Sequence, residues 1–121
     1  MYVAGGVKEN MKGRKVMRVL RFIVGGQNIM KDPTCDFTGI TAGTVGYLMA
    51  SFSLSSEWSG CKVAASFWKI DEEYPVVLTN GRCKIPAEAL DWDYFDVQLT
   101  GIKQGYKIVT NKLRVEQERI I

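Results

Sequence analysis

Two runs in which every second side chain is apolar constrain the fold of this chain more than any other feature. The first consists of Leu48, Ala50, Phe52 and Leu54, and the second of Cys61, Val63, Ala65 and Phe67. A period of two marks a β-strand with one buried face. The segment between the runs, Ser-Ser-Glu-Trp-Ser-Gly at 55–60, is rich in turn residues. We therefore predict neighbouring strands at the hydrophobic centre of a β domain.

Further alternating runs predict the other strands, at 15–24, 74–79, 82–85, 94–102 and 106–116. Pro75 favours a sheet edge because proline has no amide hydrogen to donate, and Asn80-Gly81 is the clearest hairpin signal. We expect one helical turn at 86–90 and a bulge near Thr110-Asn111. Seven or eight short strands with a single helical turn indicate an all-β sandwich.

The segment from Gln27 to Gly46 has the composition of a loop, with Lys31-Asp32-Pro33-Thr34 followed by several glycines. We expect at most a short strand near 36–40 within it. Loops of this length in compact domains are uncommon and often form interfaces. Asp32 and Pro33 are therefore candidate interface residues.

Charge is distributed unevenly along the chain. Residues 1–21 carry six basic side chains and one acidic one, a net charge of +5, whereas the remaining residues carry ten basic and twelve acidic ones, a net charge of −2. We predict a flexible basic arm at 1–14 and a single β-sandwich domain at 15–121. The arm could contact phosphate or an acidic protein surface, or it could simply be a solvated leader. Its candidate interface residues are Lys8, Lys12, Arg14 and Lys15.

The sequence offers no set of residues that indicates an enzyme. The chain contains no histidine, which excludes Ser-His-Asp and Cys-His nucleophile systems and the common histidine-bearing zinc sites. Asp91, Asp93 and Asp96 lack the glycine and terminal glutamate of a calcium loop. We therefore predict no catalytic residue, no metal ligand, no cofactor and no enzymatic activity.

The three cysteines, Cys35, Cys61 and Cys83, cannot all pair within one chain, and none lies in a Cys-x-x-Cys spacing. We expect reduced, mostly buried thiols. A single bridge between Cys61 and Cys83 stays open as an alternative.

The tryptophans Trp58, Trp68 and Trp92 could form a platform on which a sugar stacks, or they could fill the core. Trp68 has the opposite parity to the buried Phe67, so we expect it to face out of the sheet and to form an interface. A carbohydrate-binding module is therefore an alternative function.

Several segments together resemble a known family. They are Phe52–Trp58, Val63–Phe67, Val76–Gly81, Cys83–Pro86, Val97–Gly101 and Thr110-Asn111. Over about Gln27 to Gln117 the chain resembles the N-terminal domain of upper baseplate and tail-fibre-associated proteins of tailed phages that infect Gram-positive bacteria. The resemblance implies an immunoglobulin-like antiparallel β-sandwich that anchors a protein in the virion.

This resemblance implies a tail, baseplate or fibre-anchoring subunit, made in the bacterial cytoplasm and located in the virion. Its partners would be other virion proteins and copies of itself, in a ring or another homo-oligomer. The chain stops near Ile121 without a fibre segment, so a capsid decoration or head fibre subunit is an equal expectation. We expect no nucleic acid partner. We also expect no membrane partner, because no apolar run approaches the roughly 20 residues that span a bilayer.

Overall fold

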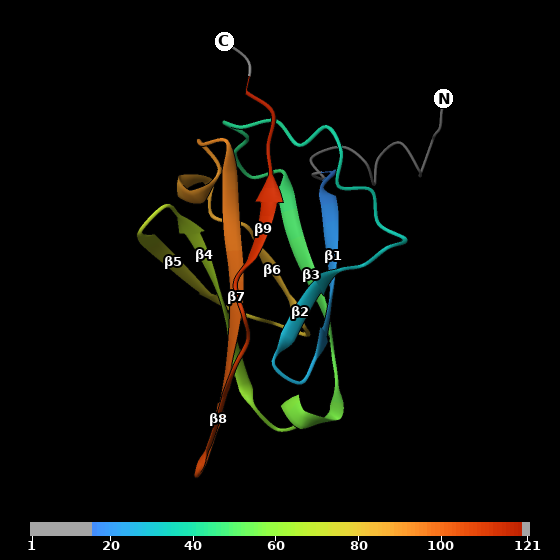
Figure 1. Ribbon diagram of the computed structural model, residues 1–121, viewed down its shortest axis with the longest axis vertical. Helices are drawn as coiled ribbons and strands as arrows, with labels where there is room; N and C mark the ends of the chain where they lie inside the picture. Colours follow the sequence, from blue (N-terminus) through green and yellow to red (C-terminus); the bar gives the residue numbers. More distant parts are fainter. Residues whose placement is uncertain (1–15, 120–121) are drawn as a thin grey trace, which may run out of the picture.

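Two β-sheets make up the part of the chain that the structure describes, residues 16–119 of a computed structural model (Figure 1). The first sheet has the strand order β2-β1-β3-β6 and contains β1 (Arg18–Gly25), β2 (Asn28–Lys31), β3 (Leu48–Leu54) and β6 (Arg82–Lys84). The second has the order β5-β4-β7-β8, and β9 also pairs with β7; it contains β4 (Lys62–Lys69), β5 (Glu72–Val77), β7 (Tyr94–Lys103), β8 (Tyr106–Val109) and β9 (Leu113–Glu116). The described residues contain no α-helix, so the prediction of an all-β protein is confirmed.

One hydrophobic core collects the inward-facing side chains of both sheets. The predicted alternation is confirmed, because the core includes Leu48, Ala50 and Phe52 from β3 and Val63, Ala65 and Phe67 from β4. The ring of Phe52 stacks on that of Phe22 at a centroid distance of 5.2 Å. Close-packed aliphatic and aromatic side chains of this kind supply most of the free energy that stabilises a small domain.

The prediction that the two alternating runs are neighbouring strands is wrong. β3 and β4 belong to different sheets, because the chain between them passes from one sheet to the other. The crossing contains a short 3-10 helix, Ser56–Trp58, which turns the Trp58 side chain inward until only 2% of it is exposed. The indole Nε1 donates a hydrogen bond to the carbonyl oxygen of Gly26 at 2.9 Å. Turn residues alone do not show whether a connection stays within one sheet.

The expectation of a wholly antiparallel arrangement is wrong, because β1 and β3 pair in parallel over seven residue pairs. A parallel pair needs a long crossover connection, and residues 32–47 provide it. The long loop also contains a strand that the sequence did not predict: β2 forms a hairpin with β1. No strand forms at 36–40.

The remaining predicted features of the second half of the chain are confirmed, with one difference. Pro75 lies in the edge strand β5, and a 3-10 turn forms at Ala87–Ala89. Asn80 and Gly81 both have positive φ angles, 53° and 73°, as a tight hairpin turn requires. However, only Thr79 and Arg82 pair across this turn, and the strands on either side of it enter different sheets.

The predicted bulge near Thr110-Asn111 divides the last strand into β8 and β9. The Thr110 Oγ1 accepts a hydrogen bond from the amide of Leu99 at 3.0 Å. The Asn111 Oδ1 accepts one from the amide of Ile29, in the opposite sheet, at 2.9 Å. The interruption in the strand therefore also links the two sheets along one side.

The predicted arm at 1–14 lies outside the described residues, as do Lys8, Lys12, Arg14 and Lys15. The three cysteine sulfurs form no disulfide bond, and Cys83 is buried.

We predict that Gly101→Ala destabilises the fold. A Cβ at this position would lie 2.7 Å from Cε3 of Trp58 and 3.2 Å from the Cβ of Cys61. Overpacking of this kind costs about 1–3 kcal/mol, which urea unfolding would measure. Gly25→Ala is the matched control, because nothing lies within 4 Å of its added Cβ. Equal unfolding midpoints for the two variants would contradict this account of the crossing.

We also predict a pH dependence that originates at Cys83. Burial raises the pKa of the Cys83 thiol to about 12, above the value of about 8.5 expected in the unfolded chain. The folded state therefore holds the thiol proton more tightly, and this contribution to stability is complete below about pH 8.5 and declines as the pH rises toward 12. The wild type should lose more unfolding free energy between pH 8 and pH 10 than Cys83→Ala. Parallel pH profiles of the two proteins would contradict the prediction.

Candidate functional site

The three tryptophans do not form a common platform. Trp58 is buried in the core and cannot stack on a surface ligand. Trp68 faces out of the five-stranded sheet, as its parity predicted, but it is half-buried because the Lys112 Nζ lies 3.5 Å from its ring centroid. Trp92 lies beneath the guanidinium of Arg119 at 5.0 Å. Neither Trp68 nor Trp92 therefore presents an uncovered ring to solvent.

The acidic residues before and within β7 are each paired with a base. Asp91 binds Lys69 at 2.8 Å, and Asp93 binds Arg119 at 3.3 Å. Asp96 forms an ion pair with Arg114 at 3.0 Å. Within the described residues, no group of three histidine, cysteine or carboxylate side chains could hold a metal ion.

The candidate interface residues Asp32 and Pro33 form a local turn. The Asp32 Oδ1 accepts hydrogen bonds from the amide and the hydroxyl of Thr34, at 2.9 and 2.8 Å. These bonds lower the pKa of the Asp32 carboxyl, with the amide bond contributing most. The turn follows β2 in one sheet, whereas Trp68 lies on β4 in the other. The structure does not bring these two candidates together.

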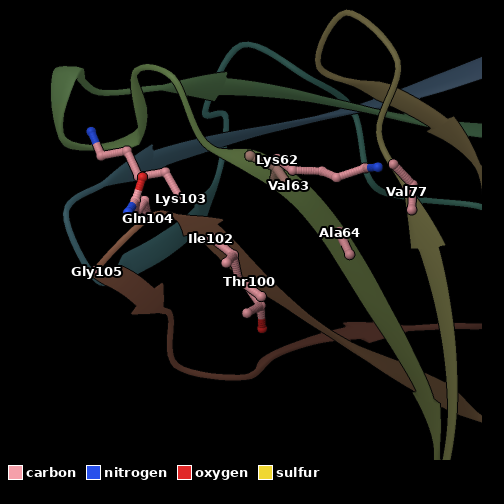
Figure 2. A pocket seen from close by; sticks show the side chains of 9 residues that line it. All are labelled: Lys62, Val63, Ala64, Val77, Thr100, Ile102, Lys103, Gln104 and Gly105. Atoms are coloured by element: carbon pink, nitrogen blue, oxygen red, sulfur yellow. The ribbon is translucent and has the colours of Figure 1, made fainter.

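The feature best suited to binding is a groove of about 650 Å³ on the outer face of the five-stranded sheet, which we call the β4–β7 groove. Its lining residues are Lys62, Val63, Ala64, Val77, Thr100, Ile102, Lys103, Gln104 and Gly105. Figure 2 shows these residues on the start of β4, the end of β5, the end of β7 and the turn between β7 and β8.

Strand register explains why the outer face of the sheet has a depression at the groove. Ala64 lies opposite Val77 on β5 and opposite Thr100 on β7. A small residue therefore separates two larger ones across the sheet and leaves a depression between them. Val77 and Ile102 form the apolar walls, and each remains 55% exposed.

The opposite half of the same sheet face is covered by its own polar contacts. The Ser66 hydroxyl donates a hydrogen bond to Glu73, Lys112 covers Trp68, and Arg114 binds Asp96. These cross-strand pairs stop one row before Ala64. The apolar groove is thus the part of this face that its own side chains leave open.

Lys62 gives the β4–β7 groove a positive charge at its edge, whereas the Lys103 ammonium points away from the groove in Figure 2. Lys62 is exposed beside Ile102, and in Figure 2 its side chain extends toward Val77. Lys103 donates a hydrogen bond to the carbonyl oxygen of Ser59 at 2.8 Å. Within the described residues, no carboxylate forms an ion pair with either lysine. The groove therefore favours a ligand that is apolar at its centre and acidic at its edge.

No family model, curated protein or solved structure matches the chain. The resemblance to phage baseplate proteins therefore stays a hypothesis. The described residues contain no helix with the length and apolar character needed to cross a membrane.

Reasoning from the sequence did not find the β4–β7 groove. Its signal is weak: Ala64, Val77 and Ile102 are apolar residues in the solvent-facing phase of three strands. They become neighbours only when the order β5-β4-β7 is known, and alternation within one strand does not reveal that order.

We predict that the double variant Val77→Ser/Ile102→Ser binds less of an apolar dye such as anilinonaphthalene sulfonate. Both side chains are half exposed, so each substitution should change the unfolding free energy by less than about 0.5 kcal/mol. Met30→Ser, on the other sheet and 44% exposed, is the matched control and should leave dye fluorescence unchanged. Unchanged fluorescence in the double variant would show that the groove is not an accessible apolar surface.

Proposed function

We propose that this chain is a non-enzymatic structural subunit of a bacteriophage particle and works through protein–protein contacts. Its place would be the tail, the baseplate or the anchor of a fibre, with capsid decoration as the alternative. We also propose that its two sheets correspond to the immunoglobulin-like sandwich of the phage family that the sequence resembles. The open apolar groove with Lys62 at its edge is the observation that carries the protein-binding part of this proposal.

The size of the groove favours assembly within a particle over tight binding of a single partner. Complete burial of an aliphatic side chain contributes about 1.5–3 kcal/mol, and the groove offers two, Val77 and Ile102. Association costs an estimated 4–15 kcal/mol in lost translational and rotational freedom. One such contact therefore needs support from others, which a particle with many subunits supplies.

We predict that particles purified from cells that carry this gene contain the chain and that Ile102→Glu reduces its incorporation. A carboxylate in the apolar wall would have to lose its hydration when a partner covers it, and it would repel an acidic partner. Quantitative immunoblotting of purified particles would measure the loss, expected to be at least about fivefold for a centrally placed contact residue.

Lys84→Glu is the control, because Lys84 is an exposed residue of β6 in the other sheet. Both variants must first show wild-type unfolding midpoints. Normal incorporation of Ile102→Glu, or absence of the wild-type chain from particles, would reject the proposed function.

A further inference from the structure

An exposed isoleucine lies at the opposite end of β4 from the groove. Ile70 is 49% exposed and occupies the two-residue turn between Lys69 of β4 and Glu72 of β5. Its φ angle is +58°, a region that β-branched residues rarely occupy. Hairpin turns of this length normally place glycine, asparagine or aspartate at such positions.

The strained turn presents an apolar side chain within an acidic segment. Asp71, Glu72 and Glu73 follow Ile70 directly, and all three are exposed. Glu72 accepts a hydrogen bond from the Tyr74 hydroxyl at 2.9 Å, and Glu73 accepts one from Ser66. Asp71 forms no ion pair within the described residues. The nearest base, Lys69, is already paired with Asp91. We call Ile70 and Asp71 the β4–β5 tip.

The tip and the groove complement each other in shape and charge. The tip is a single apolar side chain with carboxylates beside it, and the groove is an apolar depression with the Lys62 ammonium at its edge. They cannot meet within one copy, because the groove begins at Lys62 and the tip follows Lys69, at the two ends of one strand. Figure 1 shows the β4–β5 turn and the β7–β8 turn toward opposite ends of the long axis.

We propose that the β4–β5 tip of one copy binds in the β4–β7 groove of the next, so that copies of this chain associate head to tail. This inference rests on the proposed function and identifies the partner at the groove as a second copy. Strained backbone positions persist where a local conformation is needed for binding, and Ile70 fits that pattern because glycine would relieve the strain but remove the apolar side chain. A head-to-tail contact produces a closed ring or an open filament, according to the rotation between copies.

Ile70→Gly tests the tip without threatening the fold. Glycine is favoured at a positive φ, so the melting temperature should not fall, whereas self-association should weaken by about 30-fold, as for a central contact residue. Sedimentation velocity at increasing concentration would measure association of the full chain. Asn80→Gly is the matched control: among residues 16–119, Asn80 is the other non-glycine residue with a positive φ angle, and this substitution should leave association unchanged.

A mixture of two defective variants distinguishes the tip–groove contact from any other contact between copies of the chain. Ile70→Gly lacks the tip but keeps the groove, and Ile102→Glu keeps the tip but has a damaged groove. Each alone should be monomeric, and the mixture should form one-to-one pairs that grow no further. Lys62→Glu and Asp71→Lys should each weaken association, and a chain that carries both should recover part of it.

Three results would overturn the proposal. They are a wild-type chain that stays monomeric up to about 1 mM, an Ile70→Gly chain that associates as the wild type does, and a mixture that stays monomeric or grows beyond pairs. If any one of these results occurs while Ile102→Glu still fails to enter particles, the groove binds a different virion protein and the proposed function stands. If incorporation of Ile102→Glu is also normal, the proposed function fails as well.

Discussion

The contact between Trp58 and Gly101 is the interaction on which the arrangement of the two sheets depends. The indole lies between the sheets, its Nε1 is bound to the carbonyl of Gly26 in the β1–β2 turn, and its ring occupies the space that a side chain on β7 would need. It therefore links the four-stranded sheet, the crossing segment and the centre of the five-stranded sheet. Because the crossing is fixed in this way, β4 pairs with β5 and β7 instead of β3, and these pairings create the groove.

The sequence predicts the faces of the strands better than their neighbours. A period of two identifies Phe52 and Phe67 as inward residues whichever sheet each strand joins, because burial depends on the side-chain phase alone. Sheet membership depends on long-range pairing, which the residues at 55–60 do not reveal. Dependence on long-range pairing also explains why the parallel pairing of β1 with β3 was not predicted. β2 was missed for another reason, because its four residues are too few to show a period.

The candidate site was harder to predict than the fold, for two physical reasons. An isolated apolar residue in the solvent-facing phase, such as Val77 or Ile102, is common on protein surfaces and carries little information. It becomes a groove only when strand register places Ala64 between such residues. The positive φ of Ile70 is likewise hidden, because isoleucine disfavours that region and its presence in a sequence argues against a tight turn there.

The position of β4 makes it suited to connect two contacts. It lies between β5 and β7 and is hydrogen-bonded on both sides, so the groove at its start and the tip at its end are held rigidly relative to each other. Eight residues at a rise of about 3.3 Å each separate the two by about 26 Å. In a head-to-tail assembly this spacing sets the scale of the repeat between copies. A rigid connection also means that the rotation between neighbours is determined by how the tip fits the groove, and that fit decides between a closed ring and an open filament.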